Sequence, residues 1–142
     1  MNTEPTRKDG QPLMLLCLDL EAGSAQLAAA AAAVARRCKA AMHLLYVQPS
    51  HGSGDDRGRL EARLRRLVEP ALDGAPPAGV TIRRGVPEEV IVAHASEIDA
   101  RSIVLGRRRR SAVERIYVGS TTAAVLSLAR RPVLVIPVSE RS

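Results

Sequence analysis

Residues 13–39 read LMLLCLDLEAGSAQLAAAAAAVARRCK, and this stretch decides the fold. It begins with an almost continuous apolar run that ends at Asp19, a pattern that predicts a strand buried on both faces. The polar residues 21–24 predict a loop, with Ser24 as the N-cap of the next element. Residues 25–39 are rich in alanine and end in cations, which favours a helix. A buried strand followed by a helix is the unit from which parallel α/β sheets are built.

The same alternation continues to the end of the chain. Ligands of open α/β sheets bind at the carboxyl ends of the strands, where the strand order reverses, and Asp19, Val47 and Gly106 lie at such ends. Pro70 lies late in the helix predicted at residues 57–73, and we expect it to shorten or kink this helix. The pattern predicts further strands at residues 41–47, 80–82, 102–105 and 133–138, and further helices at residues 57–73, 85–99 and 119–131.

Length and composition favour one globular domain. The chain has 142 residues and is 46% hydrophobic, which is enough for a core of valine, leucine, isoleucine and alanine. Two tyrosines are its only large aromatic residues, which argues against a protein that stacks nucleic-acid bases. The polar residues 1–12 predict a flexible tail before a domain at 13–142, with a flexible loop at 50–56 inside that domain.

Neither a signal peptide nor an apolar run of membrane-spanning length is evident, so we expect no membrane partner. Cys17 and Cys38 lack the spacing of a CxxC or metal motif, and Cys17 lies inside an apolar run. Free thiols of this kind fit a reducing compartment, and we expect a cytoplasmic protein.

Positive charge is concentrated in one segment. The net charge of the chain is +6, and residues 101–115 contain six arginines and one acid, a local charge of +5. Such a field favours an anionic partner such as a phosphate, a nucleotide or a polyanion. The alternative is a solvated loop in a chain whose cations are nearly all arginine. A polyanion or nucleic-acid binder that uses Arg107 to Arg110 is the least favoured hypothesis, because the sequence has no readout motif.

Glycine spacing adds a family resemblance. Gly106 is followed by two residues, then Arg109, then nine residues, then Gly119 and Ser120. This resembles the signature of the universal stress protein family, which reads Gly, two residues, Gly, nine residues, Gly, and Ser or Thr. Three of its four positions match, and Arg109 replaces the second glycine. The segments HLLYVQP, RGVP and RRPVLVIPV also resemble the family, so that the resemblance covers nearly all of residues 13–138.

The resemblance implies a fold, a role and an assembly. The implied fold is a three-layer αβα sandwich, Rossmann-like and similar to the adenine nucleotide alpha hydrolases, with a five-stranded parallel sheet of order 3-2-1-4-5. The implied role is a regulatory one in stress response and signalling. The implied assembly is a homodimer through the fifth strand, between Val133 and Val138. An exposed last strand rich in valine and isoleucine is consistent with that assembly.

The resemblance also implies an adenine-nucleotide site, with ATP and Mg²⁺ as candidate cofactors. In family members that bind ATP, the acid after the first strand helps to hold the nucleotide, and a backbone group after the second strand meets adenine. The glycine loop and the following Ser or Thr wrap the phosphates. The corresponding residues of this chain are Asp19, Val47, Gly106, Arg107, Arg109, Gly119, Ser120 and Thr121.

Each of these residues also has a simpler explanation. Ser120 could be only an N-cap, and Asp19 could only cap the loop that follows it. Glycine at position 109 would allow a left-handed backbone and a close approach of phosphate, whereas arginine there adds strain and bulk. One outcome of Arg109 is therefore a blocked site. The other is that Arg107 to Arg110 turn outward and hold the phosphates through their guanidinium groups. The alternative function is a dimeric interaction protein of the same fold that does not bind ATP.

Catalytic chemistry has little support in the sequence. His43, His51 and His94 have no nucleophile at a recognisable spacing, and no metal-ligand cluster is evident. We assign no catalytic and no metal-binding residue, and expect at most a weak ATPase.

Overall fold

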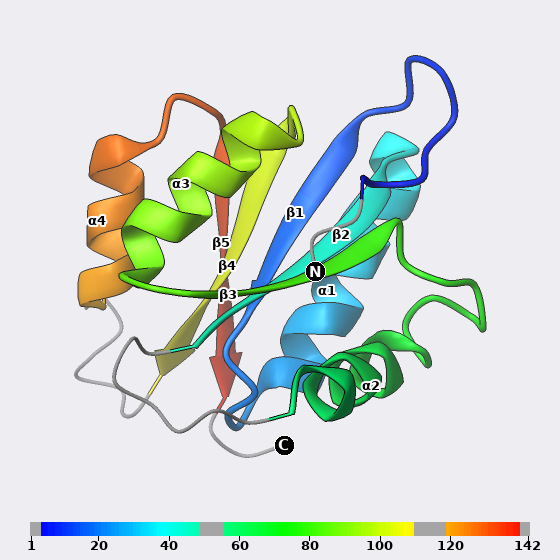
Figure 1. The fold of residues 1–142 in the computed structure, drawn as a ribbon, viewed down its shortest axis with the longest axis horizontal. Helices are drawn as coiled ribbons and strands as arrows, with labels where there is room; N and C mark the ends of the chain where they lie inside the picture. The colour runs from blue at the N-terminus through cyan, green and yellow to red at the C-terminus, as the bar shows by residue number, and fades with distance from the viewer. Residues whose placement is uncertain (1–3, 49–55, 110–118, 140–142) are drawn as a thin grey trace.

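The computed structural model describes residues 4–48, 56–109 and 119–139. Within these residues the chain alternates strictly between strand and helix (Figure 1). The strands are β1 (Leu13–Leu18), β2 (Ala41–Gln48), β3 (Gly79–Arg84), β4 (Ser102–Arg109) and β5 (Val133–Ser139). The helices are α1 (Ser24–Cys38), α2 (Arg57–Val68), α3 (Pro87–Glu97) and α4 (Ser120–Leu128).

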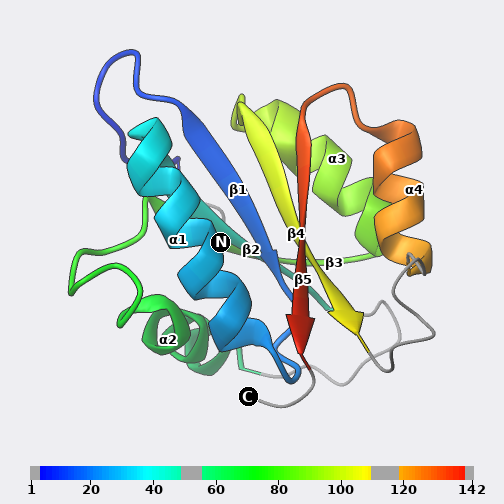
Figure 2. The same ribbon diagram turned by 180° about the vertical axis from the view of Figure 1, so that it is seen from behind.

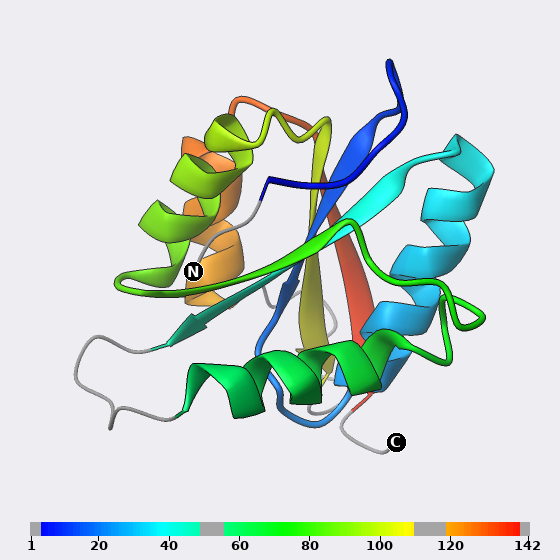
Figure 3. The same cartoon turned by 45° about the vertical axis from the view of Figure 1, so that its right-hand side comes forward.

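The strands form one parallel sheet of order β3-β2-β1-β4-β5, which confirms the predicted fold. β1 lies at the centre, where Leu13 pairs with Ala41 of β2 and Met14 pairs with Ser102 of β4. Helices α1 and α2 cover one face of the sheet, and α3 and α4 cover the other (Figures 2 and 3). The strand order therefore reverses between β1 and β4.

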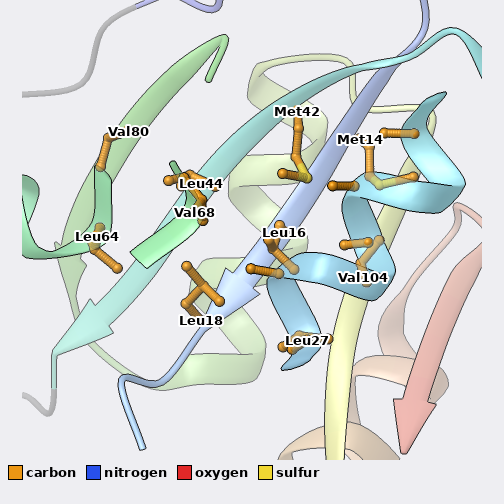
Figure 4. Close-up of a cluster of buried hydrophobic side chains, with 14 of the residues drawn as sticks. Met14, Leu16, Leu18, Leu27, Met42, Leu44, Leu64, Val68, Val80 and Val104 are labelled. Atoms are coloured by element: carbon orange, nitrogen blue, oxygen red, sulfur yellow. The ribbon is translucent and has the colours of Figure 1, made fainter. Parts of the chain in front are cut away.

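The core has two halves, one on each face of the sheet. Side chains of β1 contribute to both halves. Met14, Leu16 and Leu18 are buried against α1 and α2, as Figure 4 shows, and Leu15 is buried against the α3 side. The face of α1 that meets the sheet is mainly alanine, and these small side chains let the helix approach the strands closely. This two-sided burial explains why β1 reads as a continuous apolar run.

Two predicted helices end earlier than the sequence indicated. α2 stops at Val68 instead of residue 73, because Pro70 has no N–H to donate to the preceding turn of the helix. α4 stops at Leu128 instead of residue 131, and Ala129 is already extended. The chain must straighten there, because Pro132 accepts a hydrogen bond from the backbone of Ile103 as β5 begins beside β4.

The fourth strand is longer than predicted. We expected it to end at Leu105 with a loop from Gly106 onward, but β4 continues to Arg109. β5 supplies ladder partners for the extra residues, from Gly106 opposite Ile136 to Arg109 opposite Ser139. Neither Gly106 nor Arg109 has a positive φ, so the expected left-handed backbone at position 109 is not found.

The predicted N-cap residues are one position off. Gly23 caps α1, and Ser24 is its first residue, whose hydroxyl donates to the carbonyl of Glu21 at 2.8 Å. Gly119 likewise precedes α4, so Ser120 lies inside the helix. Gly23 is required twice: its φ is +91°, and a Cβ there would lie 2.9 Å from Cγ2 of Val138.

Hydrogen bonds attach the segment before β1 to the rest of the domain. The amide of Thr6 donates to the carbonyl of Ala78 at 2.8 Å, and the side chain of Gln11 donates to the carbonyl of Lys39 at 3.2 Å. Most of the predicted loop at 50–56 lies outside the described residues.

A pair of histidines is buried between β2 and α3. His43 and His94 are both fully buried, and their Nε2 atoms lie 3.3 Å apart. His43 Nε2 also lies 2.8 Å from the hydroxyl of Thr81. Burial, and then the neighbouring His94, lower the pKa of His43 to about 4. The pKa of His94 is lowered by burial and by Arg83, against the opposing effect of Glu97. The fold therefore requires both rings to be neutral.

This burial predicts acid sensitivity. A histidine whose pKa is depressed by folding contributes its full stability above the ordinary value of about 6.5, and loses it as the pH falls towards the folded value. His43 alone should reduce the free energy of unfolding by about 3 kcal/mol between pH 7 and pH 4. Urea unfolding at a series of pH values measures this loss, and His43→Gln should flatten it. An equally steep loss in the variant would contradict the assignment.

Gly23 gives a second prediction, with Gly74 as a matched control. Both have positive φ, but a Cβ at Gly74 would meet nothing within 4 Å. Gly74→Ala should cost about 1 kcal/mol for the left-handed backbone alone. Gly23→Ala should cost about 1–3 kcal/mol more, because its Cβ must displace Val138. Chemical denaturation of both variants measures the difference, and equal losses would rule out the steric contribution.

Candidate functional site

A cavity of about 500 Å³ opens at the carboxyl ends of the strands, where β1 and β4 diverge. The strand order reverses at this point, which is where open α/β sheets bind ligands. Of the predicted site residues, seven line the cavity together: Asp19, Val47, Gly106, Arg107, Gly119, Ser120 and Thr121. The topology brings them together from four separate strand and helix ends.

Asp19 begins the β1–α1 loop, lines the cavity and makes hydrogen bonds within the loop. Its Oδ1 accepts hydrogen bonds from the amide of Glu21 at 3.0 Å and from the hydroxyl of Ser24 at 3.2 Å. Its Oδ2 accepts one from the guanidinium group of Arg108. The capping role considered from the sequence is therefore present, and the carboxylate also faces the cavity.

The first turn of α4 forms the opposite wall. Gly119, Ser120 and Thr121 line the cavity, and no side chain of the described residues caps the helix start. The first amides of a helix lack partners within it and carry the positive end of the helix dipole. A Cβ at Gly119 would meet nothing within 4 Å, so the backbone at this position borders open space. This wall can hold an anion.

β4 forms the third side of the cavity. Gly106 is needed there for space and not for backbone freedom, since a Cβ would lie 3.0 Å from Cδ2 of Leu27. Arg107 and Arg108 both line the cavity. The sequence analysis placed its emphasis on Arg109, whose backbone belongs to β4 and whose side chain lies outside the described part of the chain.

Arg108 contacts Asp19, Glu21 and Ala22 in the cavity. The sequence analysis considered it only as one of the four arginines 107–110 and did not single it out as a site residue. In β4 it lies on the same face as Gly106, because alternate residues of a strand share a face. Strand alternation would have singled it out if the sequence had predicted a strand that continued beyond Leu105.

The deeper part of the cavity is largely apolar. Pro87 and Ile91 at the start of α3 contribute to it, with Val47 and Tyr46 from the end of β2. Tyr46 and Pro87 lie in segments that resemble the family but were not assigned to the site, and Ile91 lies in no such segment. Cys17 also lines this part, and burial raises the pKa of its thiol, so that it stays protonated. A flat apolar group such as a base would fit these walls.

A second groove, of about 630 Å³, lies at the other end of the strands from the cavity. Its lining is polar and comes from the segment before β1 and from the turns around Asp99 and Arg131. Arg131 already pairs there with Asp99 at 3.1 Å. This groove lies at the amino ends of the strands, away from the reversal of strand order, and we do not assign it to the candidate site.

Two further features bear on the class of protein. Among the described residues, no three histidine, cysteine or acidic side chains are grouped as a metal ion would require. No helix in that part of the chain is long and apolar enough to cross a membrane.

Three solved structures with this architecture are distant from this chain in sequence. A universal stress protein from Lactobacillus plantarum is 23% identical, with a TM-score of 0.71 over 88% of this chain and 97% of that chain. A universal stress protein from Archaeoglobus fulgidus in complex with dAMP is 22% identical, with a TM-score of 0.64 over 89% and 97% of the two chains. A universal stress protein in complex with cAMP is 18% identical, with a TM-score of 0.64 over 89% and 97%. At these identities the likeness shows the fold.

Sequence comparison supplies the family itself. No curated protein matches the chain. The model of the universal stress protein family, in contrast, matches residues 13–137, which includes every strand up to β5 and all four described helices. The chain therefore belongs to the universal stress protein family.

Proposed function

We propose that the cavity at the ends of β1 and β4 binds an adenine nucleotide, and that the protein uses this binding for regulation in the stress response. The observation that carries the proposal is the pairing of an apolar recess with an anion-binding wall in one cavity. Base and phosphate need these two environments at opposite ends of the same site.

The phosphate end is formed by α4 and β4. The same cavity is lined by Gly119, Ser120 and Thr121 at the start of α4, where no side-chain cap is present among the described residues, and by Arg107 and Arg108 of β4. An arginine side chain can donate two parallel hydrogen bonds to a phosphate. A glycine loop donates to phosphate from its backbone N–H groups instead. In this proposal the arginines replace part of the glycine loop, which makes the phosphate loop an altered one.

The base end lies between β2 and α3. The apolar side chains of Val47 and Ile91 flank it, and the backbone of Val47 is the proposed partner of adenine. Two structural relatives were determined in complex with cAMP and with dAMP, which supports an adenine nucleotide as the ligand class.

ATP with Mg²⁺ is the specific cofactor that we propose. No metal-binding cluster of side chains is present in the described part of the chain, so Mg²⁺ would be held mainly by the phosphates and water. Both cysteines are free thiols, which supports a reducing, cytoplasmic location.

Gly119→Val tests the phosphate end of the site. The backbone of Gly119, with φ −61° and ψ 158°, suits valine, and a Cβ meets no neighbour within 4 Å. The fold should therefore be retained, while the added methyl groups project into the space proposed for phosphate. Isothermal titration with AMP, ATP and Mg-ATP should show an affinity at least about tenfold lower than that of the unchanged protein.

The melting temperature of the variant is the control for this experiment. Unchanged affinity in a folded Gly119→Val protein would contradict the placement of phosphate against α4. Absence of nucleotide binding in the unchanged protein would favour the interaction protein that does not bind ATP.

We also propose that the protein forms a homodimer through β5. Within the described residues this strand pairs only with β4, so its other edge is open. Leu134 is a large apolar residue exposed on this strand. An open apolar edge favours association with a second copy unless it is covered.

Leu134→Glu should therefore convert the dimer to a monomer, because the two copies would bring like charges together at the paired edges. Size-exclusion chromatography with light scattering measures the mass. Leu126→Glu, at a comparably exposed leucine on α4, is the control and should remain dimeric. Dissociation by the control, or a Leu134→Glu protein that stays dimeric, would place the interface elsewhere.

A further inference from the structure

Arg108 links β4 to the β1–α1 loop across the cavity. Its Nη2 pairs with Oδ2 of Asp19 and lies 3.3 Å from Oε2 of Glu21. Its Nε donates to the carbonyl of Ala22 at 3.3 Å. Only 23% of the Arg108 side chain is exposed, although the two carboxylates that it contacts are mostly exposed. All four residues line the cavity proposed for the nucleotide.

The sheet fixes the position of this arginine. Arg108 is held in the β4 ladder opposite Val138, the residue against which Gly23 packs. It shares a strand face with Gly106, where the missing side chain leaves room for Leu27 of α1. The side chain of Arg108 therefore leaves the sheet on the α1 side, directly towards residues 19–22.

Both oxygens of the Asp19 carboxylate are consequently occupied. Oδ1 accepts from the Glu21 amide and the Ser24 hydroxyl, and Oδ2 accepts from Arg108. A ligand hydroxyl that binds Oδ2 must share this oxygen with Arg108 unless the guanidinium group moves away from it. Arg108 in turn can leave two carboxylates without loss only if another anion takes their place.

We propose that Arg108 is a specificity-determining residue that makes binding in this cavity depend on a ligand phosphate. The phosphate replaces Asp19 and Glu21 as the partner of the guanidinium group, and Oδ2 of Asp19 becomes free to accept a sugar hydroxyl. This inference rests on the proposed nucleotide function and adds the requirement that the nucleoside be phosphorylated.

The relative strengths of the competing pairs support this exchange. Ion pairs with exposed carboxylates such as Asp19 and Glu21 are weak, because water screens them. A phosphate seated against the first turn of α4 gains the amides of that turn in addition to the guanidinium. A neutral nucleoside has no phosphate to pair with Arg108. It must therefore bind while Arg108 is still paired with the Asp19 carboxylate.

The test compares AMP with adenosine by isothermal titration. The unchanged protein should bind AMP more tightly by at least about tenfold, since a charge-assisted contact is present only for AMP. Arg108→Gln removes the charge and should reduce this AMP-to-adenosine ratio by about tenfold. Arg101→Gln is the matched control, because Arg101 is an exposed arginine that lines the groove at the other end of the strands. It should leave the ratio unchanged.

The outcomes distinguish the role of Arg108 from the nucleotide function on which it rests. If the protein binds AMP but Arg108→Gln leaves the ratio unchanged, the role of Arg108 is wrong and the nucleotide function stands. If neither the unchanged protein nor either variant binds AMP or adenosine, the nucleotide function itself fails.

Hydrogen exchange provides a measurement that needs no ligand. In the ligand-free protein, Arg108→Gln should speed amide exchange in residues 19–24 relative to Arg101→Gln, because the loop loses its attachment to β4. Exchange elsewhere in the sheet reports whether the variant is folded. Equal exchange in the loop of both folded variants would show that Arg108 does not hold it, and would overturn the inference.

Discussion

The whole structure depends on the burial of β1 on both faces and its pairing on both edges. β2 occupies one edge of this strand and β4 the other. The connections that leave the two sides of β1 therefore cover opposite faces of the sheet, and a gap is left between them at the carboxyl ends. That gap is the cavity, which is lined by the ends of strands, the first turns of helices and the loop between β1 and α1. The site is a consequence of the strand order.

Much of this architecture could be predicted from the sequence, because burial and helix formation leave local patterns. The run from Leu13 to Leu18 predicted β1 with its correct bounds, since a strand covered on both faces must be apolar throughout. The family resemblance supplied the strand order, and the cavity then brought together seven predicted residues. What failed were the ends of elements, such as those of α2 and β4. An element's end depends on its neighbours in space, as the pairing of Arg109 with Ser139 shows.

The arginines at residues 107–110 show that the sequence also could not predict the direction of a single side chain. Charge alone indicated an anionic partner but did not distinguish one arginine from the next. Once β4 is known to continue to Arg109, strand alternation directs Arg108 to the α1 side and to Asp19. The chain therefore carries, inside its candidate site, a cation and the carboxylates that neutralise it. In the exchange that we propose, a ligand phosphate takes the place of these carboxylates, which couples the chemistry of the ligand to the β1–α1 loop.

The most direct test of the central claim is to locate the nucleotide on the folded protein in solution. Two-dimensional NMR spectra of the isotope-labelled protein, recorded during titration with AMP, report which backbone amides change their environment. The shifts should concentrate in residues 19–24, 106–108 and 119–122, which come from three separate elements and meet only at the cavity. Shifts confined to residues 7–13 and 99–101, at the groove at the other end of the strands, would contradict the claim.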